Sequence, residues 1–386
     1  MLARYNFKLA YKAAIAILII ISCTLCFQLS RVPNSADILH ESSKNSIEKP
    51  SIMMHGEEIN YLDQPIKITS DEEIRDYFSV NSVIGSKNNP LIISNLQLSA
   101  DFLVNGNDST SILYLENISI YLVIETCFFD VPDNLTISGF FLKNCPYVTI
   151  NSLQIEGSEY GIKAKNCPAI IIQNSNIIEF SSAGISLDDC SNATLIYNSI
   201  RNGKGNGFEV FFSPNSQISH NLISNCSASR DFTGNGIFIQ WSNWSNISHN
   251  QVSQNHANWK KNAGNGIMLE HSDYSILESN YVAENNGIHN NKSMGYFMPE
   301  FSYVESFIAD TTGIGIYIQS TYYTVIRKNI AFNNSVNGFN FLFSDHGYFY
   351  NNTAFLSGAA GISVLVSYEA SSGPGYNIDA KSNRTN

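Results

Sequence analysis

Three carboxylates in the middle of the chain are candidates for acid–base chemistry on a sugar. Glu209 and Glu270 each stand in a short apolar stretch that begins with glycine, and Asp231 follows Arg230 in a more polar stretch. A glycoside hydrolase needs two carboxyl groups at a defined separation, and strand spacing would put Glu209 and Glu270 about 10 Å apart along an axis, the upper limit for an inverting pair. A lyase would instead need a Ca²⁺ cluster of acids and a basic proton acceptor, to which Asp231 with Arg230 or Lys260 could contribute.

Aromatic, amide and basic side chains accompany these acids. Aromatic rings stack on the apolar faces of sugars, while amides and carboxylates give the directed hydrogen bonds that hydroxyl groups need. Any one of these residues is more often an ordinary surface group, so only their clustering favours a substrate site. The candidate binding residues are Arg230, Phe238, Gln240, Trp241, Trp259, Lys260, His271, Tyr317 and Gln319.

Metal chemistry has weaker support. His289, Met294 and Met298 lie close together in the sequence, and imidazole with soft thioethers suits Cu(I), but surface histidines are the simpler explanation. The seven cysteines form neither a C-x-x-C pair nor an evident disulfide framework. We therefore predict no metal site, consider copper unlikely, and leave the cofactor open, with Ca²⁺ as the choice if the chain is a lyase.

A repeat of 22–23 residues positions the candidate residues. Each unit opens with a glycine and continues with alternating apolar and variable residues, as in Gly266-Ile267-Met268-Leu269, a period of two that marks a strand with one buried face. The second and fourth residues after each glycine should face outward. The opening glycines are Gly139, Gly161, Gly184, Gly207, Gly236, Gly266, Gly315, Gly338 and Gly361.

Two further landmarks keep the same register. Six residues after each glycine stands a small side chain, first cysteine (Cys145, Cys167, Cys190) and later serine or threonine. Fourteen residues after it stands asparagine six times running, which predicts a buried hydrogen-bonded ladder at a corner. These asparagines are Asn198, Asn221, Asn250, Asn280, Asn329 and Asn352. The pattern predicts an all-β chain, a parallel β-helix with three short strands per coil, right-handed by the general preference of parallel crossovers.

Three consecutive units carry extra residues at one corner. The intervals from the ladder asparagine to the next glycine are 15, 16 and 35 residues in place of 9, which locates insertions around 226–234, 255–264 and 285–313. Solenoid loops accept insertions anywhere, but three adjacent ones at one corner favour the wall of a cleft beside the glycine strands.

The first 65 residues differ from the repeat. Arg4, Lys8 and Lys12 precede an apolar run from Ala13 to Leu29, which predicts a signal anchor over 1–29, although a cleaved signal peptide is the alternative. Residues 30–65 are predicted to be an extracellular linker, 66–138 an N-terminal cap with irregular first coils and a short helix near Asp71–Phe78, and 139–386 the regular coils. The expected location is the cell membrane, single-pass with the bulk of the chain outside, or secreted if the segment is cleaved.

Composition excludes one class of partner. The net charge is −11 and no stripe of Lys or Arg occurs, which argues against nucleic-acid binding.

The phrases NNPLIISNLQL, YLVIETCFF, NGIFIQ and NGIMLE resemble the NosD-like, carbohydrate-binding and sugar-hydrolase (CASH) family of right-handed parallel β-helix repeats, over residues 66–386. The resemblance implies a fold, whereas members of the family include sugar-active enzymes, binding proteins and a copper-site maturation factor. The leading hypothesis is a membrane-tethered protein that binds polysaccharide or glycan along one sheet face. The alternatives are a lyase, hydrolase or epimerase that uses the same cleft, and a structural or copper-accessory surface protein without catalysis.

Overall fold

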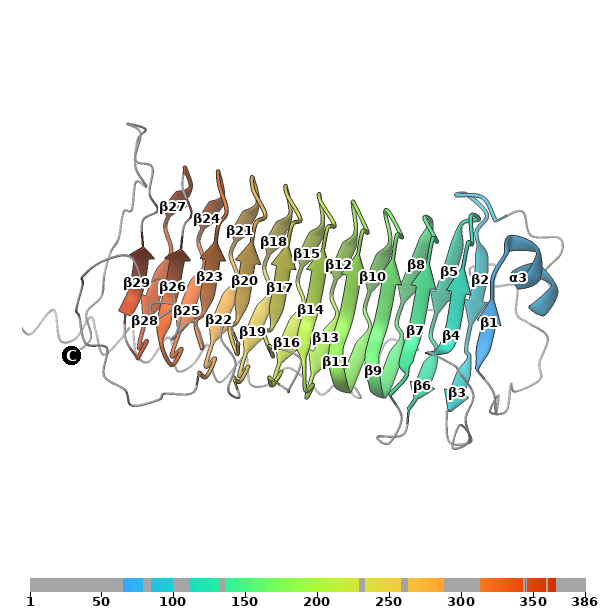
Figure 1. Cartoon of the computed structure of the whole chain (residues 1–386). Coiled ribbons are helices and arrows are strands. Elements are labelled where there is room, and N and C mark those ends of the chain that lie inside the picture. The colour runs from blue at the N-terminus through green and yellow to red at the C-terminus, as the bar shows by residue number, and fades with distance from the viewer. Residues whose placement is uncertain are drawn as a thin grey trace, which may run out of the picture. The chain divides into compact units, whose positions relative to one another are not determined.

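The chain winds into a parallel β-helix in which every coil lies directly on the one before it (Figure 1). The computed structural model describes residues 65–78, 85–99, 111–131, 136–228, 233–257, 263–287, 313–342, 344, 346–358 and 360–365. They all belong to the compact unit Glu57–Asn386. The predicted anchor over 1–29 and the linker up to residue 64 lie outside the described residues.

The first sheet is built from the strands that contain or directly follow the repeating glycines, preceded by β1 and β4 of the first coils, and we call it the glycine-strand sheet. Its strands pair in parallel in the order in which they are named here. They are β1 (Ile66–Ile68), β4 (Ser111–Glu116), β7 (Ser138–Lys143), β9 (Gln154–Lys165), β11 (Asn176–Asp188), β14 (Asn206–Phe211), β17 (Ile237–Gln240), β20 (Ile267–Glu270), β23 (Ile316–Gln319), β26 (Asn337–Leu342) and β29 (Ala360–Leu365).

The second sheet follows each glycine strand after a sharp corner. It comprises β2 (Leu91–Ser94), β5 (Leu122–Glu125), β8 (Val148–Asn151), β10 (Ile171–Gln173), β12 (Thr194–Ile196), β15 (Gln217–Ser219), β18 (Asn246–Ser248), β21 (Ile276–Glu278), β24 (Val325–Arg327) and β27 (Tyr348–Tyr350).

The third sheet closes each coil and leads to the next glycine strand. It contains β3 (Gln97–Ser99), β6 (Phe128–Asp130), the first halves of β9 and β11, β13 (Ser199–Arg201), β16 (Leu222–Ser224), β19 (Gln251–Ser253), β22 (Tyr281–Ala283), β25 (Ile330–Phe332) and β28 (Thr353–Phe355). Because β9 and β11 run through the corner without a break, the first and third sheets are continuous there.

The core lies inside the coils and consists of equivalent apolar residues stacked from one coil to the next. Ile237, Ile267 and Ile316 pair in register on β17, β20 and β23, and all three are fully buried. The period-two pattern after each glycine therefore marks the inward side chains, as the sequence predicted. The parallel β-helix with coils of this length is confirmed.

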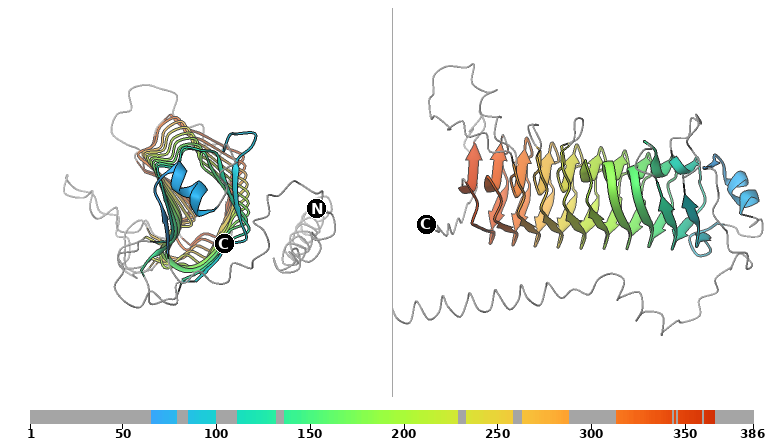
Figure 2. Two further views of the ribbon diagram at one scale, coloured as in Figure 1. Left: turned by 90° about the vertical axis from the view of Figure 1, so that its right-hand side faces the viewer. Right: turned by 90° about the horizontal axis from the view of Figure 1, so that it is seen from below.

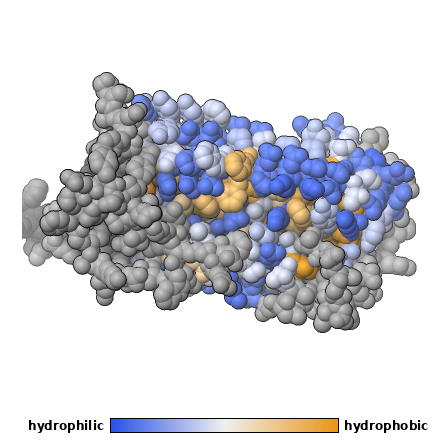
Figure 3. All heavy atoms as spheres, viewed as in Figure 1, coloured by the Kyte–Doolittle hydropathy of each residue, from blue (hydrophilic) through white to orange (hydrophobic). Residues whose placement is uncertain are grey.

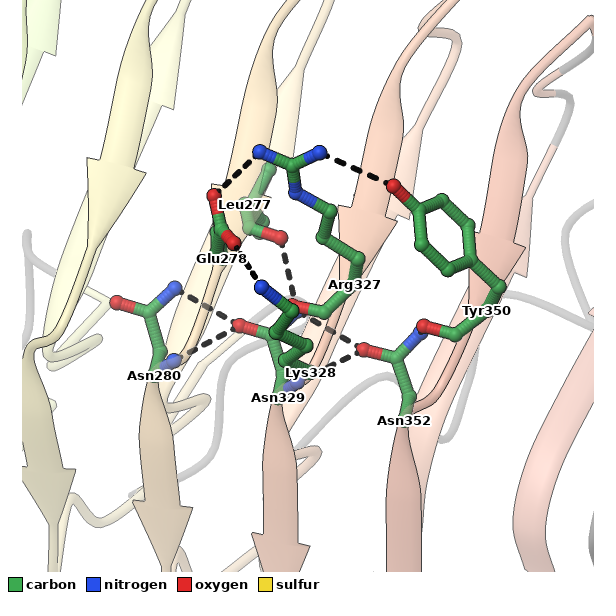
Figure 4. A network of polar contacts seen from close by, with 8 residues as sticks. All are labelled: Leu277, Glu278, Asn280, Arg327, Lys328, Asn329, Tyr350 and Asn352. Atoms are coloured by element: carbon green, nitrogen blue, oxygen red, sulfur yellow. Dashed lines mark hydrogen bonds and ion pairs between the residues drawn. The ribbon is translucent and has the colours of Figure 1, made fainter.

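The predicted asparagine ladder is confirmed by its hydrogen bonds (Figure 4). The side-chain amide of Asn280 donates to Oδ1 of Asn329 at 2.9 Å, and Asn329 donates to Oδ1 of Asn352 at 3.0 Å. The Asn329 amide also donates to the carbonyl of Leu277 at 2.9 Å. Each asparagine thus satisfies a corner carbonyl and links two coils, which removes unpaired polar groups from the interior.

The corner after each glycine strand uses the left-handed backbone region without glycine. Phe212, Trp241, His271 and Ser320 have φ of 48°, 53°, 47° and 49°. Such a conformation costs about 1 kcal/mol or more for an ordinary residue. Here the backbone ladder offsets that cost, because each of these N–H groups donates to a carbonyl of the next coil, as Trp241 does to Glu270 at 3.1 Å. The side chains at these corners point outward in columns.

The N-terminal end is covered by α3 (Asp71–Tyr77), where the sequence predicted a short capping helix. Ser70 caps it by accepting a hydrogen bond from the backbone N–H of Glu73 at 3.1 Å. Ile74 is fully buried, and the view along the axis shows the helix lying across the end of the coils (Figure 2). Within the part of the chain that the structure describes, no helix is long and apolar enough to cross a membrane.

Candidate functional site

The outward positions of the glycine-strand sheet form two rows along the axis. Register pairing places Glu209, Phe238, Met268 and Tyr317 in one row. The same pairing places Phe211, Gln240, Glu270 and Gln319 in the other. The structure therefore brings the predicted strand residues together on neighbouring coils.

Glu270 lies at the centre of the second row, between two amides. Gln240 donates from Nε2 to Oε2 of Glu270 at 3.0 Å, and Gln319 stands opposite Glu270 on the following coil. The His271 Nε2 lies 3.9 Å from Oε1 of Glu270. Burial raises the pKa of the Glu270 carboxyl, although His271 and the Gln240 hydrogen bond partly oppose this. The Glu270 carboxylate therefore combines one oxygen bonded to Gln240 with a second oxygen directed toward His271.

Tyr317 stands two residues before Gln319 on β23 and has no exposed surface. Its ring packs outside the main core with Met268, Ile314 and Leu342. Its hydroxyl donates to Oε1 of Gln319 at 2.7 Å, and burial raises the pKa of Tyr317 above its ordinary value. A ligand would thus meet the Gln319 amide, whereas the sequence suggested direct contact with the Tyr317 ring.

Trp241 and His271 directly follow Gln240 and Glu270, so they lie beside the second row, at the ends of β17 and β20. Their rings are stacked, with centroids 4.1 Å apart and planes inclined by 6°. Trp241 is 48% exposed. Both side chains leave from left-handed corner residues one coil apart, so their positions are set by the backbone ladder.

Glu209 occupies a different environment from Glu270. It is 6% exposed, accepts a hydrogen bond from Nδ2 of Asn206 at 2.8 Å, and has its pKa raised by burial. The register separates the two carboxylates by two coils and two residues, about 12 Å between Cα atoms from standard strand dimensions. The side chains of Phe238 and Met268 occupy the intervening positions of the Glu209 row. The pairing of Glu209 with Glu270 as the two carboxyls of a hydrolase stays a prediction.

The three predicted insertions leave the β-helix from stacked stems. Ser227, His256 and Asn286 pair as parallel bridges on successive coils. On the return side Gly234 and Gly264 adopt φ of 63° and 66°, a conformation that favours glycine. The described stems therefore lie at one corner. The predicted residues Arg230, Asp231, Trp259, Lys260, His289, Met294 and Met298 lie outside the described residues.

Sequence reasoning missed several exposed aromatic residues near this site. Phe212, 54% exposed, holds the same corner position as Trp241 one coil earlier. Trp244, Tyr274 and Tyr323 stack from coil to coil along the axis, with ring centroids 5.3 and 5.0 Å apart. Their fixed places, five and eight residues after the repeating glycine, were available as a signal. One long side of the molecule also shows a hydrophobic band bordered by hydrophilic residues (Figure 3).

No metal centre is visible in the described part of the chain, where no group of three or more His, Cys, Asp or Glu side chains is placed to hold an ion. Cys127, Cys145, Cys167, Cys190 and Cys226 are buried free thiols. Cys145, Cys167 and Cys190, which hold the small-residue position six residues after the glycine, are thus interior residues.

Comparison with known proteins supports the architecture. A family model described as "Right handed beta helix region" matches residues 123–252, within the predicted coils. A search of curated protein sequences returned no match.

Solved structures of similar fold include the periplasmic alginate epimerase AlgG, with 13% identity, a TM-score of 0.41, and coverage of 78% of this chain and 82% of that one. The A-module of the Azotobacter vinelandii mannuronan C-5 epimerase AlgE4 has 11% identity, a TM-score of 0.40, and coverage of 80% and 90%. Tailspike protein 2 of Escherichia coli O157:H7 bacteriophage CAB120 has 11% identity, a TM-score of 0.43, and coverage of 70% and 38%. These are likenesses of fold and say nothing of activity.

Proposed function

We propose that this chain is an exported β-helix protein that binds a polysaccharide or glycan along the glycine-strand sheet, with the Gln240–Glu270–Gln319 row as the centre of the site. The observation that carries the proposal is a carboxyl group flanked by two amides on adjacent coils, beside a stacked pair of aromatic rings. This combination gives hydrogen-bond donors and acceptors at coil spacing together with an apolar edge, which matches a hydroxyl-rich ring with an apolar face.

Rigidity adds to the support for binding. Gln240 on β17 and Gln319 on β23 stand on the two strands that pair with β20, and their amides are held by Glu270 and Tyr317 respectively. A ligand therefore meets side chains that have already lost most of their freedom, which lowers the entropic cost of association.

The test is a glycan array followed by titration calorimetry with the full-length chain. Gln240→Ala and Gln319→Ala should each weaken binding about tenfold, because each removes a directed hydrogen bond to a neutral or charged group, worth about 1.4 kcal/mol. Gln217→Ala, an exposed outward glutamine on β15 of the second sheet, is the matched control and should leave affinity unchanged. Equal affinity in all three variants would refute the assignment of the site.

A catalytic role at the same site is the second candidate, as a lyase, hydrolase or epimerase. It is favoured by the raised pKa of Glu270, since a partly buried carboxyl is suited to proton transfer. Turnover of a bound polysaccharide that disappears in Glu270→Gln while binding persists would establish it. Binding without turnover by the wild-type chain would leave the protein a binding module.

We further propose that residues 1–29 anchor the chain in the cell membrane with the β-helix outside, in keeping with the basic flank and apolar run of the sequence. Resistance of the protein to carbonate extraction, together with its digestion by protease added to intact cells, would support this. Release into the medium with a new N-terminus would indicate cleavage instead. The NosD-like subfamily and its copper-accessory role rest on the resemblance and on His289, Met294 and Met298, and copper retention after dialysis tests them.

A further inference from the structure

The residue that follows each glycine strand belongs to one outward column. Backbone hydrogen bonds define it, because the N–H of Trp241 donates to the carbonyl of Glu270, and the N–H of His271 donates to that of Gln319, each at 3.1 Å. The next member, Ser320, donates in the same way to Leu342 at 2.9 Å. Side chains in this column therefore leave the β-helix directly above one another at the spacing of the coils.

Among the described residues, the aromatic stack in this column ends at His271. The Trp241 and His271 rings are parallel within 6° and 4.1 Å apart, but the following coil carries the small side chain of Ser320. Among the described residues no ring continues the stack over Ser320, and the His271 side chain remains 34% exposed. One ring position is thus left beside the imidazole, over Ser320.

Hydrogen-bonding groups surround that position. Gln319, which precedes Ser320, has its Oε1 engaged by the Tyr317 hydroxyl, so its Nε2 is the part of the amide left to donate to a ligand. Glu270, on the same coil as His271, uses Oε2 for Gln240 and keeps Oε1 toward the His271 side. A ring placed over Ser320 would therefore have a hydrogen-bond donor, Gln319 Nε2, and an acceptor, Glu270 Oε1, on the two neighbouring coils.

The charges on this face change along the axis. From β14 to β26 the described outward positions two and four after each glycine carry no Lys or Arg, and include the carboxyls Glu209 and Glu270. The lysines of this face lie on the earlier strands, at Lys67, Lys143, Lys163 and Lys165. An anionic sugar over Ser320 would face the Glu270 carboxyl with no cation from these strands to offset the repulsion.

We propose that the position over Ser320 holds a neutral pyranose ring, stacked on the open face of His271 and hydrogen-bonded through its hydroxyls to Gln319 and Glu270. This inference rests on the proposed glycan binding and specifies the sugar class and where its ring lies. The ring takes the place of the missing member of the aromatic column, so the coil spacing itself sets the stacking distance.

Ser320→Phe is the direct test, because it fills the position with a ring from the protein. The column already accepts bulky aromatic residues at the same backbone conformation, as Phe212 and Trp241 show, so the variant should fold with an unchanged melting temperature. We expect it to bind hexasaccharides of β-1,4-linked glucose or mannose at least tenfold more weakly than the wild-type full-length chain, measured by titration calorimetry.

Asn166→Phe is the matched control, since Asn166 holds the same column position at the end of β9, five coils away. It should bind the neutral hexasaccharides as the wild type does. His271→Ala, which removes the stacking face without adding bulk, should also weaken binding and carries the test if Ser320→Phe fails to fold.

The outcomes separate the two proposals. Wild-type affinity in both Ser320→Phe and His271→Ala, with loss in Gln319→Ala, would overturn the ring position while leaving glycan binding intact. Preference for a hexamannuronate over both neutral hexasaccharides would overturn the neutral class. Absence of binding to any oligosaccharide by the wild type would remove the proposed function and this inference with it.

Discussion

Removal of one asparagine from the buried ladder should cost the fold more than almost any other single polar substitution. Asn250 is 1% exposed and makes four side-chain hydrogen bonds. Its Nδ2 donates to the carbonyl of Ile218 at 2.8 Å and to Oδ1 of Asn280 at 3.0 Å. Its Oδ1 accepts from the backbone N–H and from Nδ2 of Asn221, each at 3.0 Å. Asn250→Ala leaves the donors of Asn221 and the Ile218 carbonyl without this partner inside the β-helix.

The magnitude follows from these contacts. A buried hydrogen bond contributes about 1 kcal/mol net, and an orphaned buried group costs about 1–3 kcal/mol, so with partial relaxation we expect a loss of about 3–4 kcal/mol in the free energy of unfolding. Urea denaturation followed by far-UV circular dichroism and tryptophan fluorescence measures it, and agreement of the two probes checks for all-or-none unfolding. Asn246→Ala on the same coil is the control, because Asn246 lies on the outward side of β18. If both variants lost the same stability, the hydrogen-bond explanation of the ladder would be wrong.

A charged substitution at the same position tests the same hydrogen bonds through the pH dependence of stability. Asn250→Asp removes the NH₂ donors and places a carboxyl against Oδ1 of Asn280 and the carbonyl of Ile218, both acceptors. The folded-state pKa of that carboxyl should rise above its unfolded value of about 3.9. The variant should therefore come closest to wild-type stability below that pH, and lose stability as the pH rises toward the folded-state pKa. A deficit independent of pH would contradict a buried ladder.

Three further predictions use the same urea assay. Gly266→Ala should lower the free energy of unfolding by about 2 kcal/mol or more, because a Cβ there would lie 2.7 Å from the backbone carbonyl oxygen of Gly315. Gly361→Ala should be tolerated, because the nearest atom to its Cβ would be 3.5 Å away. Equal effects of the two substitutions would refute the close-approach explanation. Glu209→Gln should stabilise the fold at pH 7 and not at pH 3.5, because burial raises the pKa of this carboxyl, which opposes folding once the pH exceeds its unfolded value of about 4.3. A loss of stability at pH 7 would show that the charged form is needed. Cys190→Ser should change the free energy of unfolding by less than about 1 kcal/mol, because serine already fills the equivalent place on the next coil. There the Ser213 hydroxyl donates to the carbonyl of Phe211 at 2.7 Å. A large loss of stability would mean that packing of the Cys190 sulfur matters.

The parts of the fold that could be predicted are those that repeat at fixed offsets. The glycine register and the ladder from Asn198 to Asn352 were readable because the ladder residue keeps a fixed offset from the glycine in each coil, and every equivalent residue meets the same environment. One further ladder follows the same logic and was overlooked. Asn255 donates to Asn285 and Asn285 to Asn334, each at 2.8 Å, and all three stand nineteen residues after a repeating glycine.

The candidate site was predictable in outline and not in detail. A period of two tells which side chains face outward, but the exposure of an outward residue depends on its neighbours in the same row. Tyr317 illustrates this, since its ring packs with Met268, which precedes it in the same row, and has no exposed surface. The stacking of Trp241 on His271 depends on corner dihedral angles, which alternation of apolar residues does not encode.

The uniform ladders have a consequence for how such a gene changes length. From Gly315 to Gly338 the repeat is 23 residues, and the hydrogen bonds that reach across it join equivalent residues on its two sides, as from Asn329 to Asn352. A deletion or duplication of one whole coil restores all the ladders, while a change of one residue within a strand would turn its buried side chains outward. The outward face of the glycine-strand sheet can therefore lengthen or shorten during evolution by whole coils, about 4.8 Å each.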